Sequence, residues 1–195
     1  MTHTLKLILS LLATGLTLGS FYPYLRSIFK GHTQPHVFSW IIWGITTCIA
    51  FAVQLTNGGG LGAWPIGISG ILTLGTAVIA YSKKVEITIT RLDWVFFFAS
   101  LSTLPLWYFT DNPLLAIVFL TLIDVLGFVP TIRKWLRYPE SENMTTYVLI
   151  LFRNFFAMGA LEHYTTTTLF FPAMMSVTIL CIVPVIEVKR RVLKG

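Results

Sequence analysis

Two residues of opposite charge, Asp124 and Arg153, lie within long apolar stretches of this sequence. An ionisable side chain at the centre of a bilayer costs at least about 2.5–3.5 kcal/mol, so each is expected to face a partner or a water-filled cavity. Counting residues from the ends of the stretches places both close to the midplane. Asp124 is therefore a candidate for proton coupling, and Arg153 is a candidate for binding a carboxylate or another anion through its guanidinium fork. The alternative is a structural ion pair between the two, and the sequence leaves both interpretations open.

An aromatic and polar face accompanies these charges. Trp40, Trp43 and Thr47 recur at three- and four-residue spacing, which places them on one side of a helix. Tyr147 and Asn154 occupy matching positions in a later stretch. Such a face is expected to line a cavity and to stack on a flat or sugar-like solute. The alternatives are an interfacial aromatic belt, chiefly for Trp40 and Tyr147, and polar contacts between helices. The candidate solute-binding residues are Trp43, Thr47, Asp124, Tyr147, Arg153 and Asn154.

Enzymatic and metal chemistry are not expected. His32 and His36 are four residues apart but flank Pro35 in a loop, and no third ligand is near them. Cys48 and Cys181 lie within apolar segments without metal-type spacing, so they read as small buried side chains. A catalytic site needs a nucleophile with a base, or a metal cluster, at one depth. The chain is therefore predicted to be neither an enzyme nor a cofactor-binding protein.

The composition is that of a membrane protein. The 195 residues are 55% hydrophobic and 11% charged, whereas soluble domains carry about 25% charged residues. A mean hydropathy of +0.76 agrees with this reading. The net charge of +6 would suit nucleic acid, but the basic residues sit in short loops beside apolar spans, where they act as topology signals. The expected partners are the lipid bilayer and a small polar solute, not nucleic acid.

Seven apolar stretches are long enough to cross the hydrocarbon core, and backbone groups in lipid must pair internally, so all seven are predicted to be helices. Short Gly-, Pro- and polar-rich segments separate them. Pro65 and Pro172 are interpreted as first-turn prolines of the third and seventh spans. The predicted spans are 5–25, 37–56, 61–82, 92–110, 113–135, 145–162 and 166–187.

The chain also repeats itself at a constant offset of 107 residues, as from Pro23 to Pro130. Pro65 and Pro172 keep the same register. Internal repeats of a helix bundle are typical of secondary transporters. The expected organisation is a first three-helix bundle over 1–84, a linker helix over 85–111 and a second, parallel three-helix bundle over 112–195. Pro23 and Pro130 weaken their helices locally, which favours hinges over static kinks.

Basic residues predict the orientation. Of the 14 Lys and Arg residues, 12 fall on one side of the seven predicted spans. By the positive-inside rule the N-terminus then faces outward and the C-terminus faces the cytoplasm. The expected location is the cell inner membrane, with multiple crossings.

This pattern resembles the SWEET, semiSWEET and PQ-loop transporter superfamily. Members of that superfamily have a three-helix bundle, a linker helix and a second three-helix bundle, with a Pro-Gln signature in the first helix of each bundle. The prolines are present here in Tyr22-Pro23-Tyr24 and Val129-Pro130-Thr131, while tyrosine and threonine replace the glutamine. The resemblance implies an all-α membrane protein of seven transmembrane helices in a 3+1+3 arrangement.

The function expected from these features is transport of a small polar solute by alternating access between the two bundles. Passive uniport and proton coupling through Asp124 are both open. The alternative is a non-transporting seven-helix receptor or scaffold, because the same architecture occurs without transport and fold alone does not decide function. The sequence leaves the oligomeric state open: one chain holds a complete pathway, and a homo-oligomer is compatible with it.

Overall fold

The computed structural model describes residues 2–33, 35–83, 91–137 and 144–194. These residues form seven α-helices and one short 3-10 helix. The helices agree with the predicted spans, although α1 extends further at both ends and α7 extends further at its C-terminal end. The elements are α1 (His3–Phe29), α2 (Val37–Thr56), η1 (Gly60–Gly62), α3 (Trp64–Ser82), α4 (Arg91–Thr110), α5 (Pro113–Arg137), α6 (Met144–Gly159) and α7 (Thr166–Lys194).

Polar side chains define where several helices begin. The hydroxyl of Thr2 accepts a bond from the backbone of Leu5 at 3.4 Å and caps α1. At the start of α2, Nδ1 of His36 accepts from the backbone N–H of Ser39 at 3.3 Å. Asn112 does the same for the first turn of α5. Each cap satisfies an N–H group that the helix itself leaves unpaired.

The prediction that Pro172 lies in a first turn was wrong. Pro172 is inside α7, six residues after its first residue, because Thr165 and Thr168 begin the helix earlier. The backbone N–H of each threonine donates to the hydroxyl of the other, at 3.0 and 3.2 Å. Pro65 does stand in the first turn of α3. The two repeat-matched prolines therefore occupy different positions in their helices.

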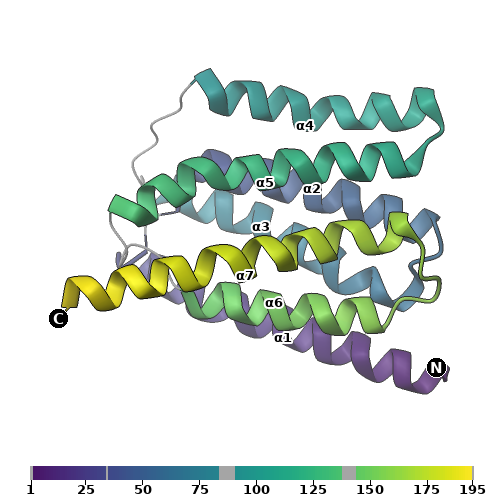
Figure 1. The fold of residues 1–195 in the computed structure, drawn as a ribbon, viewed down its shortest axis with the longest axis horizontal. Coiled ribbons are helices and arrows are strands. Elements are labelled where there is room, and N and C mark those ends of the chain that lie inside the picture. The colour runs from purple at the N-terminus through teal and green to yellow at the C-terminus, as the bar shows by residue number, and fades with distance from the viewer. Residues whose placement is uncertain (1, 34, 84–90, 138–143, 195) are drawn as a thin grey trace.

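The helices form two groups with the same internal order. Helix α3 packs against both α1 and α2, and α7 packs against both α5 and α6. The groups meet where α1 contacts α6 and α2 contacts α5. Helix α4 lies at one edge against α5 and α2, as Figure 1 shows. The main apolar core runs through both groups.

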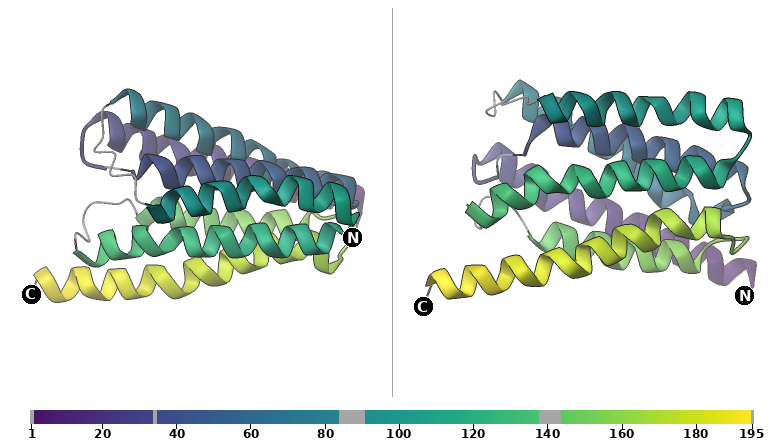
Figure 2. Two further views of the ribbon diagram at one scale, coloured as in Figure 1. Left: turned by 90° about the horizontal axis from the view of Figure 1, so that it is seen from above. Right: turned by 45° about the horizontal axis from the view of Figure 1, so that its top comes forward.

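The two ends of the bundle differ. Helices α1–α3 and α5–α7 converge at the end that carries the N-terminus and diverge toward the end that carries the C-terminus (Figure 2, left). At the converging end the α2–α3 loop meets the α6–α7 loop through its backbone. Glu162 donates its N–H to the carbonyl of Gly59 at 3.3 Å, and His163 donates to Gly58 at 3.1 Å. Lys6 adds a bond from Nζ to the carbonyl of Glu162 at 3.2 Å.

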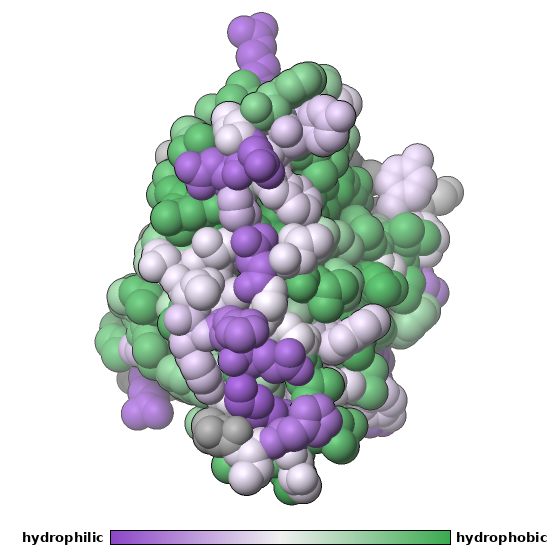
Figure 3. Space-filling view, turned by 90° about the vertical axis from the view of Figure 1, so that its right-hand side faces the viewer, coloured by the Kyte–Doolittle hydropathy of each residue, from purple (hydrophilic) through white to green (hydrophobic). Residues whose placement is uncertain are grey.

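The surface agrees with a membrane environment. In the described residues, four helical segments are long and apolar enough to cross a bilayer: α1, α2, η1 with α3, and α7. Large apolar side chains are exposed along the sides of the bundle, such as Ile71 and Val78 on α3, each 68% exposed. On the end face that carries the N-terminus, hydrophilic residues form a band flanked by hydrophobic ones (Figure 3).

Candidate functional site

A cavity lies at the seam between the two groups of helices. It has a volume of about 80 Å³ that water molecules can occupy. This exceeds the roughly 10–15 Å³ that a cavity needs to hold one water, so there is space for several waters or a small solute. The lining residues are Phe21, Trp40, Trp43, Thr47, Ser69, Thr73, Asp124, Phe128, Thr146, Tyr147, Ile150, Arg153, Phe171, Met175 and Ile179.

The structure brings five of the six predicted site residues together around this cavity. Trp43, Thr47, Asp124, Tyr147 and Arg153 all line it. The sixth, Asn154, is buried in α6 but is not part of the lining, and its amide nitrogen has no hydrogen-bond partner among the described residues.

Asp124 is held by α2 from the opposite group. Its side chain is 2% exposed, and its carboxylate accepts a short hydrogen bond from the hydroxyl of Thr46. The indole Nε1 of Trp43 donates to the backbone carbonyl of Asp124 at 3.3 Å. The contact between α2 and α5 therefore has a polar centre, where the Asp124 carboxyl group receives one hydrogen bond from a hydroxyl and none from a cation.

Arg153 faces the same cavity from α6 and is 5% exposed. Its Nε and Nη1 have no hydrogen-bond partner within the part of the chain that the structure describes. Ion pairs in that part lie on α7, where Glu187 meets Arg190 and Arg191, and none joins Arg153 to Asp124. The structural ion pair considered from the sequence is thus not formed. One acidic and one basic side chain therefore line the same cavity without pairing with each other.

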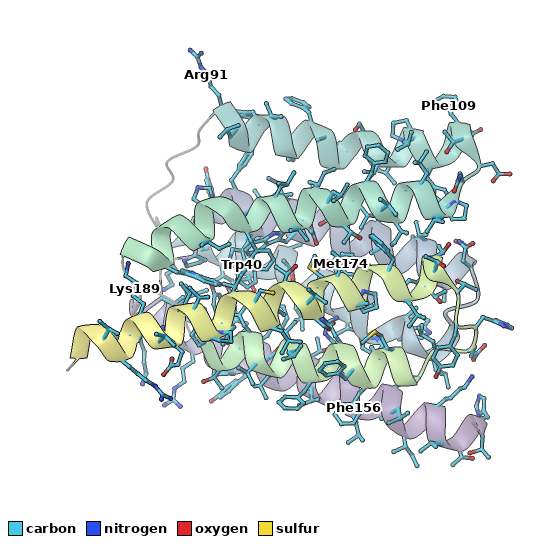
Figure 4. All side chains as sticks on the ribbon, viewed as in Figure 1. Trp40, Arg91, Phe109, Phe156, Met174 and Lys189 are labelled. Carbon is cyan, nitrogen blue, oxygen red and sulfur yellow. The ribbon has the colours of Figure 1, made fainter. Side chains whose placement is uncertain are left out.

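The aromatic residues form the walls. Trp43 packs on Phe128 with ring centroids 4.6 Å apart, and it contacts Trp40 at 6.0 Å. Trp40 and Tyr147 are each 5% exposed, and Figure 4 shows Trp40 in the interior of the bundle. The interfacial-belt alternative does not hold for these two side chains, because neither reaches the lipid-facing surface.

The cavity lining follows the internal repeat. Three pairs of lining residues are related by the 107-residue offset, so each group contributes three equivalent positions. These pairs are Phe21 with Phe128, Trp40 with Tyr147, and Trp43 with Ile150. Thr46, which bonds Asp124, occupies the position in the first group that Arg153 occupies in the second.

The two predicted hinge prolines lie within α1 and α5. Pro23 lies inside α1 and is partly buried. Pro130 falls within the range of α5, at a position whose side chain lies outside the described residues.

Two contributors to the site were missed from sequence. Thr46, one turn beyond Trp43 on the same helix, matches Arg153 in the 107-residue repeat. Phe128, which closes one wall, matches Phe21. Repeat register was the signal for both, since each is matched to a residue in the other group that lines the cavity or carries its charge.

The chemical groups at the cavity are few. Among the described residues, no group of three His, Cys, Asp or Glu side chains is arranged to hold a metal ion. The lining offers one carboxyl group, one guanidinium, several hydroxyls and aromatic faces, which can bind a polar solute.

Comparison of the chain with models of protein families, with curated proteins and with solved structures found no match in any of the three.

Proposed function

We propose that this chain is a SWEET-like membrane transporter that moves a small polar solute by alternating access between two three-helix bundles, α1–α3 and α5–α7. One observation carries the proposal: a cavity at the seam of the two groups, lined by repeat-matched aromatic residues and by the buried charges of Asp124 and Arg153. Buried charges in a membrane bundle are costly and mark solute or ion pathways. A binding cavity between repeats is typical of secondary transporters.

The packing order supports reading the two groups as repeats in a 3+1+3 arrangement. In each group the third helix lies between the first two, and α4 lies at the edge as a linker helix would. The chain direction alternates from helix to helix in Figure 1, so that α1 runs parallel to α5, α2 to α6 and α3 to α7. One extra crossing between two three-helix units produces this parallel relation. In this proposal α4, α5 and α6 also cross the membrane, which makes seven crossings.

The proposed movement is a rocking of one group against the other around Pro23 and Pro130. The structure would then represent a state closed at the N-terminal end, where the loops meet through Gly58 and Gly59. With the N-terminus outside and the C-terminus in the cytoplasm, that state is closed to the outside. The proposed location is the cell inner membrane.

Proton coupling through Asp124 is the finer part of the proposal. Its carboxylate lines the cavity and belongs to the contact between the groups, because Thr46 bonds it from α2. A group at that place can sense both the solute and the relative position of the bundles. If it couples protons, Asp124→Asn retains a folded protein but loses the dependence of uptake on a pH gradient. Unchanged pH dependence in a folded variant would remove this part of the proposal.

The test of the transport proposal is solute counterflow. The purified protein is reconstituted in liposomes loaded with unlabelled sugars, amino acids, nucleosides or vitamin precursors, and entry of the labelled solute is measured against empty liposomes. The expected result is accumulation of one solute class that is lost on Arg153→Gln. Absence of counterflow for every class, with a folded protein, would favour the non-transporting receptor or scaffold.

A further inference from the structure

The cavity presents a positive and a negative group that are each buried and do not pair with each other. Arg153 is 95% buried by its 5% exposure, lines the cavity, and leaves Nε and Nη1 without partners among the described residues. A buried guanidinium without acceptors is costly. An acceptor supplied from outside the chain would satisfy it, and a carboxylate matches its geometry best.

Asp124 lines the same cavity. Its carboxylate receives one hydrogen bond from the chain, from Thr46, whereas an ionised carboxylate has about four acceptor sites. The remaining acceptor capacity faces a cavity whose other walls are largely aromatic, including Trp43 and Tyr147. An ammonium group would use that capacity, and aromatic faces near it are favourable for a cation.

We infer that the solute is a small zwitterionic amino acid, with its carboxylate on Arg153 and its ammonium group on Asp124. The inference rests on the proposed transport function and names its substrate class. A solute with only one charge would leave the other buried group unsatisfied. A cavity with room for several waters suits a small solute such as alanine better than a disaccharide.

This assignment has a consequence for coupling. A carboxylate that carries a proton cannot hold an ammonium ion in the same place. The proton and the amino acid are therefore competitors for Asp124, and any coupling would take the form of exchange rather than co-transport.

The first experiment varies the solute and leaves the protein unchanged, so that it does not depend on a variant that folds. Thermal unfolding of the wild-type protein in detergent is measured with L-alanine, with lactate, which replaces the ammonium by a hydroxyl, and with 2-amino-1-propanol, which lacks the carboxylate. A solute that binds the folded state raises the melting temperature. The expected result is that L-alanine raises the melting temperature. The protein is expected to bind lactate and 2-amino-1-propanol with at most a tenth of its affinity for L-alanine. Equal affinity for lactate or for 2-amino-1-propanol would overturn the inference.

The second experiment uses Arg153→Gln and Asp124→Asn, with Thr121→Val as the matched control. Thr121 is buried on the same helix as Asp124 and is not part of the cavity lining. Within the part of the chain that the structure describes, its hydroxyl bonds its own helix, at the carbonyl of Ile117. L-alanine is expected to bind at least about tenfold more weakly to both charge variants and normally to the control. Normal binding to either folded charge variant would overturn the inference.

Counterflow separates failure of this inference from failure of the transport proposal. Counterflow of a sugar or nucleoside without binding of L-alanine would refute the zwitterion and keep the transporter. Binding of L-alanine without counterflow of any solute would keep the site and refute transport.

Discussion

The most direct test of the packing concerns a carbonyl group that Pro172 leaves without its helical donor. In α7, the carbonyl of Thr168 would accept from the N–H of residue 172, and proline has none. The side chain of Gln54, on α2, supplies the missing bond: its Nε2 donates to the carbonyl of Thr168 at 2.8 Å. Both side chains are fully buried. A side chain on α2 of one group thus supplies a hydrogen bond that α7 of the other group lacks.

Replacing Gln54 with leucine removes that donor at nearly constant volume. A buried carbonyl that loses its partner costs about 1–3 kcal/mol. The same change also removes the amide Oε1 of Gln54, which has no partner among the described residues, and this offsets part of the loss. The single variant is therefore expected to lose about 1 kcal/mol, which alone would be hard to interpret.

A double-mutant cycle with Pro172→Ala isolates the bond. Alanine at 172 restores a backbone N–H, so the carbonyl of Thr168 no longer needs Gln54. The cost of Gln54→Leu is then expected to vanish or change sign in the Pro172→Ala protein, while the Oε1 contribution is the same in both backgrounds and cancels. The expected coupling is about 1–2 kcal/mol, within the range for residues in contact.

The assay is denaturant unfolding in detergent micelles of the wild-type protein, the two single variants and the double variant. Changes that add within about 0.5 kcal/mol would refute the reasoning, because independent sites behave in that way. Such a result would mean that Gln54 does not bond the carbonyl that Pro172 frees.

Two further changes probe other close contacts. Thr46→Val removes the hydroxyl that donates to Asp124 and is expected to lower stability by about 1–3 kcal/mol; a melting temperature equal to that of the wild type would contradict the bond. Gly62→Ala would place a methyl carbon 2.6 Å from the carbonyl oxygen of Ala157, and such overpacking costs about 1–3 kcal/mol. Gly75→Ala, which meets nothing within 4 Å, is the matched control, and equal melting temperatures for the two glycine variants would contradict the close approach.

The helices could be predicted because the determining features are local. Apolar runs of fixed length, broken by Gly, Pro and polar residues, locate helices wherever the backbone must satisfy itself. The beginning of α7 shows where local reasoning ends. Pro172 resembles a first-turn proline, but the reciprocal bonds of Thr165 and Thr168 start the helix six residues before it. A strong cap outcompetes the preference of proline for the first turn.

The site could be predicted in part because charge within an apolar stretch is rare and costly. That signal found Asp124 and Arg153. It could not show which residue pairs with which, since pairing depends on how the helices face one another. Asn154 illustrates this: its repeat partner, Thr47, lines the cavity, but on α6 the neighbouring Arg153 does so instead. Adjacent helical residues differ by about 100° in direction, and the packing of α6 against α1 determines which one faces the seam.

The bonds at the N-terminal end bear on how the proposed transporter would open. Gln54 to Thr168, Glu162 to Gly59, and His163 to Gly58 all join one group to the other. At about 0.5–1.5 kcal/mol net for each hydrogen bond, these three favour closure of that end by about 1.5–4.5 kcal/mol. An energy gap of a few kcal/mol leaves the alternative state sparsely populated but accessible. A solute shifts the balance only by the difference in its affinity for the two states. Because the cavity walls come from both groups, its contacts change when the groups move, and this is the condition for coupling binding to opening.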